Sequence, residues 1–484
     1  MTTIKLDPGA ALLLDALHGA GHAAYAVGGC VRDSLLGLAP HDWDLCTSAR
    51  PEQVMALFGE EKCIPTGLQH GTVTVKQGGR LYETTTFRTE GAYSDGRHPD
   101  AVCFVPDVRE DLARRDFTIN AMAYSAEEGL IDPFGGRDDL AAHLVRAVGE
   151  PERRFEEDAL RILRLYRFAA RFGFAIDPAT GAAARALGPH LDCVSAERIQ
   201  EELLKLLAAP RPGSYLEPAV LAVVLPELEP EKQPERFAEL CRTIDRIEPT
   251  VENVPARLAA LLCPLGEAGA RKALRKLKCS NALTDEVTAL EREAGGGAGS
   301  FLLGHEFELR HPADALCLER HSHPAGRCPN SNSLFPPQAA VVTVAGHSIA
   351  RPIACGNRVP PQWTVLGETP GTPNTTLTVQ AKRLLGRYEL PTIQRLTALC
   401  SARHPEQTGA FAALRAEAER LTAENACCRV SQLAVNGRDL MAAGVRPGPG
   451  LRQVLNALLE AVITGQTPNE KDALLAAAAQ FSAS

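Results

Sequence analysis

Two aspartates separated by one residue offer the clearest chemistry in this sequence. Asp42 and Asp44 lie in the segment HDWDLCT, whose alternation of polar and apolar residues predicts a short strand. Residues i and i+2 of a strand project from the same face, roughly 6–7 Å apart. Such a pair could hold two Mg²⁺ ions of the kind used in phosphoryl-type transfers. A solvated acidic strand edge is the alternative interpretation of the pair taken alone.

A pair of glycines precedes these aspartates at the end of another predicted strand. The segment AYAVGG ends in Gly28 and Gly29, and Arg32 follows in the predicted helix VRDSLLGL. Glycines let backbone N–H groups approach a phosphate, a helix start favours an anion, and Arg32 could clamp it. An ordinary tight turn would also explain the glycines. Glu83, in the predicted strand LYETTTFR, either leans toward this site or is an exposed strand residue.

A third group of polar residues occupies the segment EDALRILRLYRFAAR. Asp158 and Arg161 are three residues apart, which predicts that they share one face of a helix. Aspartate accepts from an amino group and arginine donates to a ring nitrogen, so the pair suits the Watson–Crick edges of cytosine and adenine. Uracil and guanine present the reverse order of donor and acceptor. Arg164, Arg167 and Arg171 continue the stripe, for which a solvated face with ion pairs is the alternative.

Two kinds of structure are predicted to position these groups. Residues 1–145 read as mixed α and β, with helices at 10–24 and 51–58 and a hairpin formed by HGTVTVK and LYETTTFR around QGGR. From residue 151 to about 300, and again from about 379, Leu, Ala, Arg and Glu recur at helical spacing. The predicted fold class is therefore α+β, a small mixed sheet followed by an all-helical part.

Residues 305–378 interrupt the helical pattern. They hold ten of the 34 prolines and show no helical period, which predicts an irregular insertion. A zinc site is a further hypothesis there, although its spacing C-x3-H-x-H-x4-C is not a common structural pattern. Its four ligands would be Cys317, His321, His323 and Cys328. The basic stretch RKALRKLKCS at 271–280 is either a phosphate-binding surface or an ordinary exposed helix.

Length and composition limit the class of protein that this chain can be. The 484 residues suggest two to four domains, and no apolar stretch is long enough to predict a membrane span. The N-terminus lacks a secretory layout, so the cytoplasm is expected, where most of the 14 cysteines should be free. A net charge of −8 argues weakly against a nucleic-acid partner, but residues 153–171 carry six arginines against three acidic residues.

Together the motifs resemble the class II tRNA nucleotidyltransferases, the family that also contains the bacterial poly(A) polymerases. The matching segments, between about residues 25 and 207, are VGGCVRDSLLG, HDWDLCTSARPEQV, HGTVTV with YETTTFR, SDGRHPDAV, RRDFTINAMA, DPFGG, EDALRILRLYRFAARFGF and SAERIQEELLKLL. The segment VNGRDLMAAGVRPGPGLRQVL is similar to the tail of Gram-positive-type CCA-adding enzymes. The resemblance implies a nucleotidyltransferase head (1–145), a base-selecting helical neck (146–207), a helical body (208–304), the atypical insertion (305–378) and a tRNA-binding helical body and tail (379–484).

The resemblance also implies a chemistry, in which an RNA 3′-OH attacks the α-phosphate of CTP or ATP and pyrophosphate leaves. It makes Asp42 and Asp44 the catalytic residues and the Mg²⁺ ligands. Asp116 matches a ribose contact, whereas Asp95 and Arg97 lie in the segment matching a flexible loop that helps the switch from C to A addition. The full set of implied nucleotide-binding residues is Gly28, Gly29, Arg32, Arg115, Asp116, Asp158, Arg161, Arg164 and Arg167.

The implied partners are tRNA, CTP and ATP, with no membrane and with a homodimer left open. Three alternatives stand beside CCA addition: a poly(A) polymerase, a partial enzyme that adds only CC or only A, and a catalytically silent RNA-binding protein. The segment IPTGLQHGTVTV and the tail favour the CCA-adding branch, and the full SDGRHPDAV segment favours the complete activity. The intact pairs Asp42/Asp44 and Asp158/Arg161 argue against a silent protein.

Overall fold

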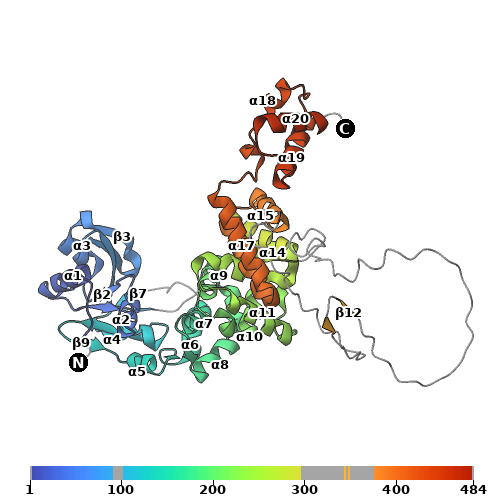
Figure 1. Cartoon of the computed structure of the whole chain (residues 1–484). Helices are drawn as coiled ribbons and strands as arrows, with labels where there is room; N and C mark the ends of the chain where they lie inside the picture. The colour runs from blue at the N-terminus through green and yellow to red at the C-terminus, as the bar shows by residue number, and fades with distance from the viewer. Residues whose placement is uncertain (1–2, 91–101, 296–342, 345–346, 349–374, 482–484) are drawn as a thin grey trace, which may run out of the picture. The chain divides into compact units, whose positions relative to one another are not determined.

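The computed structural model describes residues 3–90, 102–295, 343–344, 347–348 and 375–481 (Figure 1). By its internal contacts the chain divides into one unit of residues 1–304 with 377–484 and a second unit of residues 305–376. In the second unit, the described residues include a small antiparallel pair, β12 (Thr343–Val344) and β13 (His347–Ser348). All other elements below belong to the first unit, apart from the first two residues of α15.

A mixed seven-stranded sheet forms the centre of the N-terminal part. Its order is β3-β4-β5-β2-β1-β8-β9, and β2 pairs with β5 in parallel while the other neighbours are antiparallel. The strands are β1 (Ala24–Val27), β2 (Leu45–Thr47), β3 (Cys63–Gly67), β4 (Thr72–Gln77), β5 (Arg80–Thr86), β8 (Ala123–Ser125) and β9 (Gly129–Ile131). The predicted hairpin is confirmed as β4 and β5, because Gly78 and Gly79 both supply the positive φ that a two-residue turn needs.

Short helices surround this sheet. They are α1 (Pro8–Gly19), α2 (Gly29–Leu35), α3 (Pro51–Phe58), α4 (Val108–Ala113) and α5 (Gly136–Ala141). The first helix begins and ends earlier than the predicted 10–24, since the Asp7 carboxylate accepts the N–H of Gly9 and Ala10 and Pro8 occupies the first turn. Gly21, with φ +82°, lies just beyond its C-terminal end. A separate pair, β6 (Arg88–Glu90) and β7 (Val102–Phe104), is antiparallel.

The second half of the chain is helical, as predicted. Its helices are α6 (Pro151–Glu157), α7 (Leu160–Phe172), α8 (Pro178–Ala186), α9 (Ala196–Leu207), α10 (Pro218–Val224), α11 (Pro234–Arg246), α12 (Val254–Leu262), α13 (Gly266–Lys276), α14 (Asn281–Ala294), α15 (Thr375–Arg387), α16 (Leu390–Arg403), α17 (Thr408–Ala423), α18 (Gly437–Ala442), α19 (Pro449–Ile463) and α20 (Lys471–Phe481). A short parallel pair, β10 (Leu144–Val145) and β11 (Ala175–Ile176), ties the end of the head to the segment after α7.

Apolar packing joins the head to the helix α7. One large cluster joins the sheet, α7 and α9, with Phe117, Phe155 and Phe168 among its buried members. A smaller cluster lies within the C-terminal helices α18 to α20 around Leu440 and Leu458. The head and α7 therefore share one core, so the residues that they present to a common site are held by the same packing.

Several predictions concern residues outside the described ranges. The loop residues Asp95 and Arg97 and the four zinc candidates belong to these. The predicted insertion 305–378 does so in large part, but its last four residues are helical because α15 begins at Thr375. The eleven cysteines of the described ranges are free, and none of the described helices is long and apolar enough to cross a membrane.

Candidate functional site

A solvent-open cavity of about 260 Å³ lies between α2, the end of α4 and α7. Its lining residues are Gly28, Gly29, Arg32, Asp44, Arg115, Asp116, Asn120, Arg164, Arg167, Phe168 and Arg171. Five of these eleven residues are arginines and two are aspartates, so the lining is strongly basic. Guanidinium groups gathered in this way suit a multiply charged anion such as a triphosphate.

Gly28 brings the backbone close to an arginine of the cavity. The strand β1 ends at Val27, and Gly28 then adopts φ +76° and ψ −122°, a region that essentially only glycine occupies. A Cβ atom at this position would lie 2.9 Å from Nη1 of Arg115. Glycine at residue 28 therefore both permits the turn and leaves room for the Arg115 guanidinium.

Arg32 is buried at the floor of the cavity. Its Nε donates to Oδ1 of Asp33 at 2.8 Å, and its Nη1 donates to the side-chain oxygen of Asn120. The guanidinium carbon lies 5.3 Å from the ring centroid of Phe168 and 4.8 Å from that of Phe172. Burial lowers the pKa of Arg32, while Asp33 acts in the opposite direction. These contacts hold the cation in one orientation beneath the cavity.

Asp116 joins the head to the helix α7. Its Oδ1 accepts from the Phe117 N–H at 2.8 Å and from Asn120 at 3.1 Å, and its Oδ2 accepts from Nε and Nη2 of Arg164 at 2.9 and 2.6 Å. Burial opposes ionisation, but Arg164 and Asn120 together hold the pKa of this carboxyl well below its ordinary value. All four acceptor positions of Asp116 are thus used, so a ribose hydroxyl would have to displace one of these donors.

The other arginines of α7 that line the cavity pair with acidic residues on neighbouring elements. Nε of Arg167 lies 2.6 Å from Oε2 of the buried Glu202 on α9, and the Arg167 guanidinium carbon lies 4.0 Å from the Phe168 centroid. Burial lowers the pKa of Arg167 to about 10, which still leaves the side chain cationic at neutral pH. Arg171 lies 3.3 Å from Asp33. The three arginines of the predicted stripe therefore line the cavity, although Arg171 is 47% exposed.

The paired aspartates lie just before a strand and not within it. The strand β2 begins at Leu45, so the predicted strand over HDWDLCT is too long, although the Asp44 carbonyl still accepts the N–H of Val27 at 3.0 Å. Trp43 is buried while Asp42 and Asp44 are exposed, which preserves the alternation that the sequence predicts. Asp44 lines the cavity, whereas Asp42, with 85% of its side chain exposed, is not among the lining residues.

The electrostatic surroundings of Asp44 suit a cation. Partial desolvation in the cavity, Glu83 and Asp42 raise the pKa of Asp44 to about 6, against the opposing effect of Arg115. Glu83 is thus close enough for its charge to act on Asp44, although it is exposed on β5. The described residues contain no group of three or more His, Cys, Asp or Glu placed to hold a metal. Two carboxylate ligands alone suit Mg²⁺, which usually takes its other ligands from water and substrate phosphates.

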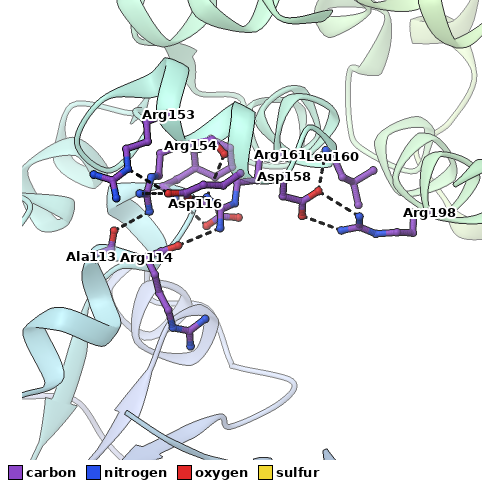
Figure 2. A network of polar contacts seen from close by, with 11 residues as sticks. Ala113, Arg114, Asp116, Arg153, Arg154, Asp158, Leu160, Arg161 and Arg198 are labelled. Atoms are coloured by element: carbon purple, nitrogen blue, oxygen red, sulfur yellow. Dashed lines mark hydrogen bonds and ion pairs between the residues drawn. The ribbon is translucent and has the colours of Figure 1, made fainter. Parts of the chain in front are cut away.

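The predicted base-reading pair does not share a helix face. Asp158 follows the end of α6 with φ −149° and ψ 102°, and α7 starts only at Leu160, so the chain breaks between Asp158 and Arg161. Asp158 pairs with Arg198 (Figure 2). Nη1 of Arg161 donates to Glu157 at 2.8 Å. Neither Asp158 nor Arg161 lines the cavity.

Sequence reasoning missed several residues that organise this site. They are Asp33, Asn120, Phe168, Arg198 and Glu202. Asn120 lies four residues after Asp116, a spacing that would have allowed the hydrogen bond to be suspected. No spacing rule links Glu202 or Arg198 to residues about 35 to 40 positions earlier, because those contacts come from the packing of α7 against α9.

Comparisons with known proteins agree with this geometry. Residues 24–146 match the Poly A polymerase head domain, residues 173–231 match the probable RNA and SrmB-binding site of polymerase A, and residues 391–478 match the putative domain 2 of tRNA nucleotidyltransferases. The CCA-adding enzyme of Limosilactobacillus fermentum is 49% identical over 40% of this chain, and that alignment spans about half, 48%, of the relative.

Longer alignments extend the similarity beyond the head. The CCA-adding enzyme of Levilactobacillus brevis is 34% identical over 96% of this chain and 96% of its own length. The crystal structure of the Bacillus stearothermophilus CCA-adding enzyme in complex with CTP is 30% identical, covers 98% of both chains and superposes with a TM-score of 0.68. With the sheet, the basic cavity and the paired aspartates all in place, the chain belongs to the family of CCA-adding enzymes.

Proposed function

We propose that this protein adds CCA to the 3′ end of tRNA, using CTP and ATP and releasing pyrophosphate. The observation that carries the proposal is the arginine-lined cavity with Asp44 at its wall, built jointly by the head and α7. Membership of the CCA-adding family, over nearly the whole length of two relatives, supports it.

Each group of the cavity has a role in this proposal. Arg32 and Arg115, beside the Gly28–Gly29 backbone, bind the triphosphate and keep its α-phosphate near Asp44. Asp42 and Asp44 would hold Mg²⁺, which supplies neutralisation of the negative charge that develops on the phosphate oxygens. Arg164 and Arg167 extend the positive lining toward the base and ribose. Holding the nucleotide in one pose is the main contribution of these side chains, since alignment of the reacting atoms lowers the barrier by several kcal/mol.

Selection of C and A would fall to Asp158 and Arg161. An aspartate acceptor beside an arginine donor matches the amino group and ring nitrogen of cytosine and of adenine. Uracil and guanine would place a carbonyl oxygen against the Asp158 carboxylate and an N–H against Arg161. Acceptor would then face acceptor and donor would face donor, so these polar groups would stay unpaired. Because these amino acids read the base, no nucleic-acid template is required.

Purified protein incubated with Mg²⁺, tRNA lacking its CCA end and each nucleoside triphosphate, alone and mixed, tests the proposal. Sequencing of the product ends should find C, C and A followed by arrest. A long A tail would move the protein to the poly(A) polymerases, and arrest after CC would indicate a partial enzyme. No addition by folded protein would favour a silent RNA-binding protein.

Asp42 offers a clean variant for the same assay. Asp42→Ala should abolish addition with an unchanged circular dichroism spectrum, because the side chain is exposed and makes no buried contact. Asp138→Ala removes another exposed carboxylate of the head, on α5, and should retain full activity. Turnover in the Asp42 variant equal to that of the Asp138 control would contradict the assignment of the metal ligands.

Three further parts of the proposal concern the surroundings of the reaction. Mg²⁺ is the proposed metal, and chelation followed by graded return of Mg²⁺ or Ca²⁺ tests it. The cytoplasm is the proposed location, since tRNA and nucleoside triphosphates are found there, and cell fractionation tests it. The homodimer stays open as an assembly, and light scattering over a range of concentrations distinguishes it from a monomer by giving the mass directly.

A further inference from the structure

The carboxylate of Asp158 is held by a neighbour on another helix. Nη1 of Arg198, on α9, donates to Oδ1 at 3.2 Å, and Nη2 of Arg198 donates to Oδ2 at 2.8 Å (Figure 2). The backbone N–H of Leu160 adds a third bond to Oδ1 at 3.1 Å. The two parallel bonds from one planar guanidinium fix the plane of the carboxylate, which a single bond would not do.

These bonds show which hydrogen-bond acceptor positions of Asp158 are used and which is free. A carboxylate has about four acceptor positions, and Asp158 uses three of them, two on Oδ1 and one on Oδ2. One position on Oδ2 therefore has no partner among the described residues. One free acceptor is enough for the amino N–H that cytosine and adenine present on the Watson–Crick edge.

Arg161 shows the complementary arrangement. Its Nη1 donates to Glu157 at 2.8 Å and to the Arg154 carbonyl at 3.2 Å, and its Nη2 donates to the Arg114 carbonyl at 3.1 Å (Figure 2). One N–H on Nη2 and the Nε–H have no partner among the described residues. Arg161 can thus donate to a ring nitrogen while its other bonds keep the side chain in place.

Both groups act electrostatically on the cavity. The charge of Asp158 raises the pKa of Arg164, and the charge of Arg161 lowers the pKa of Asp116, although each is a lesser effect beside burial and the direct Asp116–Arg164 pair. Arg198 is separate, since it neither lines the cavity nor contacts Asp116 or Arg164. Its effect on a nucleotide would therefore pass through Asp158.

We propose that Arg198 is a positioning residue that determines base specificity, because it orients the Asp158 carboxylate so that one oxygen faces the amino group of cytosine or adenine. This inference rests on the proposed function through the role given to Asp158. Lysine could keep the charge but would bind one oxygen as a point charge, leaving the carboxylate free to rotate. Because the Arg198 side chain is only 21% exposed, we choose methionine, which keeps the apolar stem of arginine and so much of its packing.

The test compares Arg198→Met and Arg198→Lys with the unchanged protein. Calorimetric titration with CTP and with UTP, without tRNA, gives the ratio of the two affinities and needs no turnover. Arg153→Met is the matched control, since Arg153 is 72% exposed and contacts Glu157 at 3.4 Å but has no contact with Asp158. Thermal unfolding of each variant reports whether the fold is retained.

We expect Arg198→Met to lower the preference for CTP over UTP by about tenfold through weaker CTP binding, a typical cost of misplacing a base-reading group. Arg198→Lys should lie between Met and Arg, and the control should match the unchanged protein. Equal weakening of CTP and UTP in a folded Met variant would reduce Arg198 to a structural residue and overturn the inference. Equal affinities of the unchanged protein for CTP and UTP would overturn it as well. Selective CTP binding without addition to tRNA would instead contradict the proposed function and leave the inference standing.

Discussion

The pair formed by Asp116 and Arg164 gives the sharpest prediction about the site. It joins the head to α7 by two hydrogen bonds of 2.9 and 2.6 Å, and both partners line the cavity. We consider Asp116→Asn, Arg164→Met and the double variant. Asparagine keeps the shape of aspartate but removes its charge and replaces one acceptor by a donor that faces Arg164.

The magnitude follows from the burial of the two side chains. Removing one partner of a buried ion pair costs about 3–5 kcal/mol because the other charge is left unpaired. The Arg164 side chain is 32% exposed and Glu202 lies 3.9 Å from its Nη1, so we expect about 2 kcal/mol for Asp116→Asn after the discount for solvent screening. Arg164→Met should cost a similar amount, about 2 kcal/mol, because Asp116 keeps only its two neutral donors.

The double variant contains no unpaired charge at this position. Its loss of unfolding free energy should therefore fall below the sum of the single losses by at least about 1 kcal/mol. Urea denaturation followed by the emission of Trp43, which is buried in the head, reports on this part of the chain. Trp363 is replaced by Phe in all four proteins so that the signal comes from Trp43 alone. Losses that add within about 0.5 kcal/mol would refute the coupling of head and α7 through this pair.

The remaining predictions concern the body, the turn before α2 and the pH response. Arg257→Met should lower the free energy of unfolding, measured by urea denaturation, by about 3 kcal/mol, because the buried guanidinium donates to three carbonyls that would lose their partner. A loss of unfolding free energy below about 1 kcal/mol would contradict this account. Gly28→Ala should weaken CTP binding about tenfold by crowding Arg115, whereas Gly37→Ala, also at positive φ but with open space around it, should cost stability alone. Burial raises the pKa of Glu291 to about 7, so its carboxyl is protonated in the folded state and ionised in the unfolded state between about pH 4.5 and 7. The stability that this group contributes is therefore present below that window and lost as pH rises through about 7. Glu291→Gln should raise the calorimetric unfolding temperature at pH 8 but not at pH 4. An equal shift at both pH values would disprove the pKa assignment.

Local features of the chain determine much of the fold without further information. The Gly78–Gly79 turn between two alternating segments specifies the hairpin, and the helical period after residue 151 specifies the second half. The alternation around Trp43 likewise predicts that Asp42 and Asp44 project away from the buried tryptophan, on the opposite face. These features depend on neighbours within a few residues, which is why spacing alone reveals them.

The partners of the polar side chains were decided by tertiary structure. Asp158 was expected beside Arg161 on one helix, but the break between α6 and α7 turns it toward Arg198, 40 residues away. Asp116 matches a ribose contact by resemblance, and its partner Arg164, 48 residues away, occupies one of its oxygens. The sequence by itself determined which residues carry the charges, whereas Asp42, Asp44 and Asp158 lie just outside the elements that it predicts for them. The ion pairs that these residues form depended on the packing of α7 against the head and α9. A buried ionic group pairs with whichever partner that packing brings within hydrogen-bond distance.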